Sequence, residues 1–319
     1  MLRHRRQFLI TPTEPFHFDG TFHKPSHFPS RLAVWTPGKH WQAIRVGRKL
    51  FGLKVEDWTN RATPGVRVSV YHDDAVDDGE TEVIKQEIRW RFDLNADLTE
   101  FNLMTKADKR FYPVFNKWLG MRNSCAHSLY ELLVIAVLLQ NATVRRTVQM
   151  LDALLDNFGA RLQFDGKEVF AMWLPEDIAI VSEQELRDLK IGYRAKFISR
   201  LSRDFAEGRV DEYGLRGMDK EGAKKELMKL YGVGPETARI LLFEACHQYD
   251  TFGHIAPWQQ KIYSRLFYKR ALVPVERVRD DIARQYGGYA MLAVHYIWED
   301  IFWKRKNEHI DWLEKEIRL

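Results

Sequence analysis

The stretch with the clearest potential for binding chemistry runs from Leu227 to Ala238 and reads Leu-Met-Lys-Leu-Tyr-Gly-Val-Gly-Pro-Glu-Thr-Ala. Gly232 and Gly234 predict a tight turn, and Pro235 suits the first position of a second helix. Because glycine has no Cβ, the backbone can approach a ligand closely, and the N–H groups of the turn point outward. Such a turn suits a phosphate of a nucleic-acid backbone, without reading base sequence. An ordinary helical hairpin fits Gly-x-Gly alone equally well, but the whole motif is far more specific.

A second informative position is Ala256. Pro257 suits the first residue of a helix, which puts Ala256 at the N-cap. Asp, Ser, Thr and Asn are favoured at an N-cap, and replacing one of them by Ala costs about 0.5–2 kcal/mol of stability. Ala256 is therefore an unfavourable residue for an N-cap, and nothing nearby in the sequence compensates for it. A position of this kind calls for a functional explanation.

The elements that must hold these positions are of two kinds, and strands come first. Apolar and polar side chains alternate over residues 66–70 and 84–92, which predicts half-buried strands. Residues 41–46 and 50–55 predict an earlier pair. The short connections favour antiparallel pairing, because parallel strands need long crossovers.

Helices follow, since after residue 94 the apolar residues recur with the period of an α-helix, about 3.6 residues. One buried helix opens at Ser128 with Glu131 three residues on, and the next closes at Gly159. Further helices are predicted over about 194–206, 224–231, 236–246, 257–268, 275–285 and 289–317. The predicted fold class is therefore α+β, with a small N-terminal antiparallel β-sheet domain (1–98) followed by a mostly α-helical body (99–319) that contains the hairpin at about 224–246.

Composition limits the classes of function. The chain has 319 residues, 45% hydrophobic and 29% charged, which are globular values. Its longest apolar run, residues 132–139, is too short to cross a bilayer. Two cysteines cannot build a disulfide framework, a four-thiolate zinc site or a four-cysteine iron–sulfur cluster, and the eleven histidines show no metal-binding spacing. We expect a cytoplasmic protein, and the net charge of +5 permits a polyanionic partner.

Together these motifs resemble the helix-hairpin-helix DNA glycosylase superfamily, the base-excision enzymes. Phe92-Asp93-Leu94 looks like the family's strand end before the helical body, and Gly192-Tyr193-Arg194-Ala195 is similar to an element of the alkyladenine and 8-oxoguanine branches. The resemblance covers roughly residues 90–300. It implies that the hairpin residues hold DNA, and these are Leu230, Gly232, Val233, Gly234, Pro235 and Thr237.

The resemblance also gives Ala256 its meaning. In this family an Asp opens the helix after the hairpin, in the pattern Asp-x5-Ile/Val-x2-Arg. Ile262 and Arg265 match the later positions, so Ala256 stands where the catalytic carboxylate belongs. Three explanations are open: an inactivated Asp-to-Ala form, a natural non-catalytic binder, or transfer of the role to His254 or Asp250.

The implied reaction is that of a monofunctional glycosylase. Such an enzyme flips a damaged or modified base, hydrolyses its N-glycosidic bond and leaves an abasic site. Bifunctional relatives carry a Schiff-base Lys where this chain has Glu236, so lyase activity is not expected. Two alternatives are the same chemistry on a bulky hypermodified base of phage DNA, as anti-phage defence, and non-catalytic binding of distorted DNA.

Other site residues follow from the same resemblance. Asn141, assisted by Gln140, is the predicted wedge that fills the gap left by the flipped base, although Asn141 could instead cap the next helix. The predicted walls of the base pocket are Trp298, Trp258, Tyr193 and His254, against the simpler interpretation that a Trp in an apolar helix belongs to the core.

The expected partner is double-stranded DNA containing a damaged or modified base, bound by a monomer in a prokaryotic-type cytoplasm, at the nucleoid. No membrane is expected. No cofactor or iron–sulfur cluster is expected either, although the hairpin could hold a monovalent cation.

Overall fold

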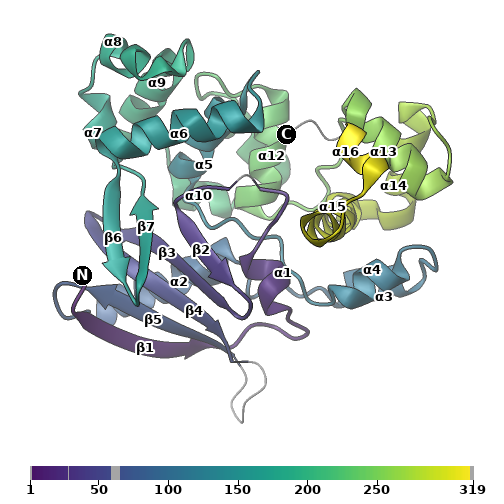
Figure 1. Cartoon of the computed structure of the whole chain (residues 1–319), viewed down its shortest axis with the longest axis horizontal. Helices are drawn as coiled ribbons and strands as arrows, with labels where there is room; N and C mark the ends of the chain where they lie inside the picture. Colours follow the sequence, from purple (N-terminus) through teal and green to yellow (C-terminus); the bar gives the residue numbers. More distant parts are fainter. Residues whose placement is uncertain (1, 28, 59–64, 317–319) are drawn as a thin grey trace.

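A computed structural model describes residues 2–27, 29–58 and 65–316 of the chain (Figure 1). The N-terminal part contains an antiparallel five-stranded sheet in the order β1-β5-β4-β3-β2. Its strands are β1 (His4–Ile10), β2 (Ala33–Thr36), β3 (Lys39–Val46), β4 (Lys49–Asp57) and β5 (Val66–His72). The predicted antiparallel sheet is therefore confirmed, including the β3–β4 pair and the strand at residues 66–70.

The two faces of this sheet pack against different elements. Val66, Val68 and Val70 of β5 point to a core closed by the short helix α1 (Phe18–Phe22) and by α2 (Asp78–Arg91). The intervening positions point to the opposite face, because successive strand residues alternate. That face is covered by a β-hairpin, β6 (Ala160–Phe164) and β7 (Lys167–Ala171), which the sequence analysis missed.

The strand predicted over residues 84–92 is wrong, because that segment is the second half of α2. Asp77 caps this helix by accepting from the Glu80 N–H at 2.7 Å, and the Glu80 carboxylate accepts from the Asp77 N–H at 3.2 Å. Ile84 and Ile88 are four residues apart, which places both on the face of the helix that meets the sheet. A spacing of four satisfies a period of two as well, so the apolar pattern alone was ambiguous.

The helical part is built around two further cores. The first is shared by nine helical segments. They are α5 (Leu129–Leu139), α6 (Val144–Phe158), α7 (Pro175–Ala179), α8 (Glu183–Leu186), η1 (Arg187–Ile191), α9 (Arg194–Ala206), α10 (Glu212–Arg216), α11 (Lys220–Leu227) and α12 (Pro235–Cys246). The predicted caps of α5 at Ser128 and of α6 at Gly159 are both confirmed.

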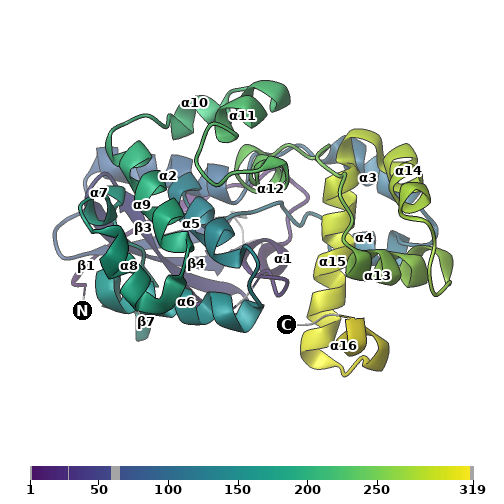
Figure 2. The ribbon, with the colours of Figure 1, turned by 90° about the horizontal axis from the view of Figure 1, so that it is seen from above.

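The second helical core lies at one side of the molecule in Figure 1. Its helices are α3 (Thr99–Lys106), α4 (Tyr112–Lys117), α13 (Pro257–Tyr268), α14 (Val275–Tyr286), α15 (Ala290–Asn307) and α16 (Asp311–Glu316). Figure 2 shows α15 running lengthwise through this group. The single helix predicted over 289–317 is wrong, because the backbone becomes extended at Glu308 and α16 starts afresh. Among the described residues, no helix is long and apolar enough to cross a membrane.

Candidate functional site

The hairpin between α11 and α12 has the tight turn that its glycines predict. Gly232 has a φ of +91°, in the left-handed region where a side chain is strained, and a Cβ there would lie 3.2 Å from Phe197. Gly234 is the N-cap of α12 in an extended conformation, and a Cβ on it would meet nothing within 4 Å. No side chain caps this end of α12, so the space in front of the helix start is open.

Some of the other hairpin residues pack against the core, and others are exposed to solvent. Val233 is buried, and Leu230 packs against the same core, so the two side chains fix the turn to the body of the protein. Pro235 begins α12 and is exposed, whereas Thr237 in its first turn is half-buried. The hairpin therefore presents backbone rather than bulky side chains at its tip.

The predicted wedge lies in the turn between α5 and α6. Asn141 is exposed and has a φ of +48°, an uncommon conformation that Asn tolerates better than most residues. The N-cap of α6 is Thr143, whose hydroxyl accepts from the Arg146 N–H at 3.2 Å. Asn141 is thus not the cap of α6; it is the left-handed residue that follows the end of α5 at Gln140.

This turn is joined directly to the hairpin. The Gln140 side-chain amide donates to the Gly232 carbonyl at 3.0 Å. The Tyr193 hydroxyl donates to the Gln140 carbonyl at 3.2 Å and accepts from the Asn141 amide at 3.3 Å, and the Arg194 guanidinium also donates to the Gln140 carbonyl. Three segments far apart in sequence therefore form one hydrogen-bonded surface.

Position 256 is the N-cap of α13, as the sequence analysis predicted. Ala256 has extended backbone angles, φ −66° and ψ 153°, and it offers no side-chain acceptor to the start of the helix. Of the two hydrogen bonds of a capping box, one is present: the Gln259 side chain accepts from the Ala256 N–H at 2.9 Å. Its catalytic role stays a prediction.

Two of the predicted pocket residues lie together beyond this helix start. The rings of Trp258 and Trp298 are 5.7 Å apart, and Trp258 is 42% exposed. The Trp298 indole donates to the hydroxyl of Tyr263, a buried residue that the sequence analysis did not select although it follows Ile262 in the family pattern. His254 is exposed in the loop that leads to Ala256.

The remaining predicted residues lie elsewhere. Tyr193 contacts the turn at Gln140 and Asn141, so it belongs to the wedge surface. Asp250 forms an ion pair with Lys220 at 2.5 Å. Glu236, at the position of the family's lysine, pairs with Arg239 at 3.1 Å.

Arg239 connects the hairpin to the loop before position 256. Its guanidinium donates to the Thr251 carbonyl at 3.4 Å and lies 3.9 Å from the Met291 sulfur of α15. The start of α12, the loop and α15 are therefore held together by one side chain.

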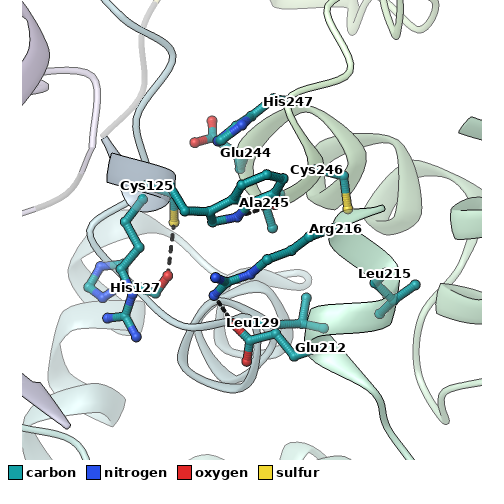
Figure 3. Close-up of a pocket in the computed structure, with 12 residues that line it drawn as sticks. Cys125, His127, Leu129, Glu212, Leu215, Arg216, Glu244, Ala245, Cys246 and His247 are labelled. Atoms are coloured by element: carbon teal, nitrogen blue, oxygen red, sulfur yellow. Dashed lines mark hydrogen bonds and ion pairs between the residues drawn. The ribbon is translucent and has the colours of Figure 1, made fainter. Parts of the chain in front are cut away.

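A small pocket lined by both cysteines lies at the C-terminal end of α12 (Figure 3). Its volume of about 10 Å³ is the size of a single water site. Burial raises the pKa of the Cys246 thiol to about 11, and burial also raises the pKa of Cys125, so neither thiol is a nucleophile at neutral pH. This pocket is structural.

The comparisons with known proteins agree with this geometry. No family model matches the chain. A DNA-3-methyladenine glycosylase of Bacillus subtilis (strain 168) is 30% identical over 171 residues, which are 53% of this chain and 56% of that protein. The chain thus spans little more than half of this relative. A putative DNA-3-methyladenine glycosylase, YfjP, of the same organism is 25% identical over 299 residues, 92% of this chain and 98% of that protein.

A solved structure resembles almost the whole fold. The 3-methyladenine DNA-glycosylase of Archaeoglobus fulgidus superposes with a TM-score of 0.74 over 95% of this chain and all of that one, at 18% identity. The sheet, the helical body and the hairpin thus have the arrangement of a known glycosylase fold. The sequence relatives are named as DNA glycosylases and the solved structure is a glycosylase of the same fold, so both comparisons agree with the resemblance to the helix-hairpin-helix DNA glycosylase superfamily.

Proposed function

We propose that the protein binds double-stranded DNA, extrudes a damaged or modified base and, given a carboxylate at position 256, releases that base by hydrolysis. The observation that carries the proposal is the hydrogen bond between Gln140 and Gly232. It couples an exposed turn suited to enter DNA with a hairpin suited to hold a backbone phosphate. Enzymes that act on a base inside a duplex need both functions.

The chemistry at position 256 follows from the transition state. As the N-glycosidic bond breaks, the sugar gains cationic character, which a nearby carboxylate stabilises while it orients or deprotonates the attacking water. Ala256 can do neither. In its present form the chain is therefore a DNA binder that lacks the hydrolytic group, and Trp258 and Trp298 offer rings on which a base could stack.

The product of the restored enzyme is an abasic site in an uncut strand. Glu236 cannot form an imine with the sugar, and its carboxylate is paired with Arg239. We also infer that the protein works as a cytoplasmic monomer without a cofactor, with no more than a monovalent cation at the hairpin.

Ala256→Asp tests the enzymatic proposal. The substitution restores both the helix cap and the carboxylate, so we expect base release to rise at least about 100-fold over the native chain, the range of a positioned acid or base. Released bases are measured by mass spectrometry on DNA carrying a panel of modified bases, and alkali cleavage then reports abasic sites.

The matched control is Ala256→Asn. Asn caps a helix as well as Asp does but carries no charge, so it separates the stability of α13 from catalysis. If neither the Asp nor the Asn variant releases bases above the level of the native chain while DNA binding stays intact, the second candidate function is supported: a non-catalytic binder of distorted DNA, which the presence of Ala256 favours.

A further inference from the structure

A second cavity, of about 460 Å³, lies between the connection from α1 to β2 and the C-terminal part of α15. This volume is typical of sites for small molecules. Its wall contains Lys24, Arg305 and Lys306, together with the imidazoles of His23, His27, His40 and His127. None of the described lining residues is Asp or Glu, although residues of this kind are frequent elsewhere in the chain.

Lys24 supplies a fixed positive charge at the cavity wall. Its side chain is buried, and its ammonium donates to the carbonyls of Gly20 at 2.7 Å and Arg122 at 2.8 Å. Burial lowers the pKa of Lys24 to about 8, while the carboxylates of Glu299 and Glu244 oppose that shift, so the group stays protonated at neutral pH. An ammonium has three N–H donors, and two of them are used by these carbonyls.

Lys306 supplies a second charge, and this residue is exposed. Its ammonium lies 3.0 Å from His23 Nε2 and 4.9 Å from the centre of the Trp35 ring. Burial, together with the Lys306 charge, lowers the pKa of His23 to about 4, so the imidazole is neutral and can accept from Lys306. By contrast, Arg305 is engaged with Glu314 at 2.7 Å.

The cavity also has aromatic walls. The rings of His23 and Trp35 are stacked in parallel, 4.2 Å apart with an interplanar angle of 8°. Phe302 also lines the cavity, and its ring centre lies 5.8 Å from that of Trp298, which in turn contacts Trp258. A row of aromatic rings thus leads from the helix that begins after position 256 to the cavity.

We propose that this cavity binds a nucleotide, with the negative charge held by Lys24 and Lys306 and the base packed against the aromatic walls. Flat rings next to fixed positive charge match a ligand that combines a base with a phosphate. Two sources can supply it: a nucleotide displaced from bound DNA, or a free nucleotide. Only the first source rests on the proposed function.

The first experiment uses the native full-length chain and free ligands. Adenosine 5′-monophosphate and uridine 5′-monophosphate are titrated by calorimetry, with the uncharged nucleosides as comparison. We expect each monophosphate to bind at least about tenfold more tightly than its nucleoside, as a charged hydrogen bond provides. Lys306→Gln should weaken binding of the monophosphate about tenfold, and Lys306 is exposed enough for the fold to tolerate the change.

The matched control is Lys304→Gln. It removes the same charge from the same helix at a residue that pairs with Asp300 and does not line the cavity. Nucleotide affinity should stay within twofold of the native value in this variant, which is within the usual effect of a surface substitution.

The second experiment identifies the source of the nucleotide. If DNA supplies it, the free monophosphate competes with duplex DNA that has one unpaired nucleotide, and Lys306→Gln weakens this DNA more than a fully paired duplex. If the free nucleotide is the ligand, it binds without competition. The proposal is overturned if neither monophosphate binds at millimolar concentration and Lys306→Gln affects DNA binding no more than Lys304→Gln does. A lack of base release by Ala256→Asp leaves the free-nucleotide result untouched.

Discussion

Asp93, in the Phe-Asp-Leu segment, has a buried carboxyl group outside the candidate site. Asp93 is buried with a φ of +50°, accepts from the Tyr249 hydroxyl, and lies 3.4 Å from Nδ1 of His247. Burial raises the pKa of this carboxyl to about 7. Between about pH 4 and pH 7 this carboxyl is therefore protonated in the folded protein and ionised in the unfolded chain. The free energy of unfolding decreases as the pH rises through that range.

Asp93→Asn should remove this pH dependence. Asn can still accept from Tyr249 but does not ionise, so we expect the variant to gain stability relative to the native chain as the pH is raised from 5 to 8. The free energy of unfolding in urea is measured at both values. Asp97→Asn is the control. Hydrogen bonds from Thr99 lower the pKa of the exposed Asp97 carboxyl, so the shift in its pKa is opposite in direction to that of Asp93. Parallel curves for native and Asp93→Asn protein would contradict the prediction.

Residues were predictable from sequence where their role is local. The N-cap at Ala256 followed from Pro257 alone, because capping depends on adjacent residues. The stack of His23 on Trp35 under Lys306 was not predictable, since Lys306 is 283 residues from His23 in the chain. Tyr193 shows a related difficulty: its motif was identified, but its contacts with the wedge turn join two segments that are about 50 residues apart in the sequence.

At the level of elements, the two glycines of the hairpin have separable roles. Gly232 needs its left-handed conformation, so Gly232→Ala should destabilise the fold by about 1 kcal/mol and distort the turn. Gly234 has ordinary angles and open space around it, so Gly234→Ala should lower the melting temperature less than Gly232→Ala does.

DNA binding should respond differently to the same two variants. We expect Gly234→Ala to lower the affinity for duplex DNA about tenfold, because the new methyl group stands where a phosphate would approach the start of α12. Fluorescence anisotropy measures the affinity, and thermal denaturation monitors the fold. Native affinity in the Gly234→Ala variant would exclude this hairpin from DNA contact.

The sequence patterns gave wrong or missing predictions for elements that were short, or whose apolar spacing fitted both a strand and a helix. Residues 84–92 fit both a strand and a helix, and the cap at Asp77 decided between them. The hairpin β6–β7 has a recognisable sequence signal, the dipeptide Asp165-Gly166. Both residues have positive φ in the structure, as a two-residue hairpin turn requires. It was overlooked because it interrupts a run of helices.

At the scale of the whole molecule, a buried ion cluster connects the sheet part to the helical body. The Glu87 carboxylate on α2 accepts from Arg91 at 3.0 Å and from Arg216 of α10 at 2.8 Å. Glu87 is only 4% exposed, and the hydrogen bond from Arg216 and the charge of Arg91 lower its pKa against the effect of burial. The cluster is a long-range feature that no local sequence pattern indicates.

Glu87→Gln should destabilise the whole protein. Removing one partner of a buried pair leaves charge uncompensated, so we expect a loss of about 3–5 kcal/mol in the free energy of unfolding. Glu212→Gln is the control, because Glu212 pairs with the same Arg216 at a more exposed position and its loss should be smaller. Urea denaturation measures both variants, and equal losses would contradict a special role for Glu87.

The hydrogen bond from Gln140 to Gly232 has a consequence for how the protein would search a genome. On the proposed function, the hairpin and the wedge turn travel along DNA as one rigid body. Each advance by one phosphate then presses the wedge against the adjacent base pair, so inspection and movement become a single event. The dwell time at each step is set by how easily that pair opens, and a weakened pair stops the protein before its base has been recognised.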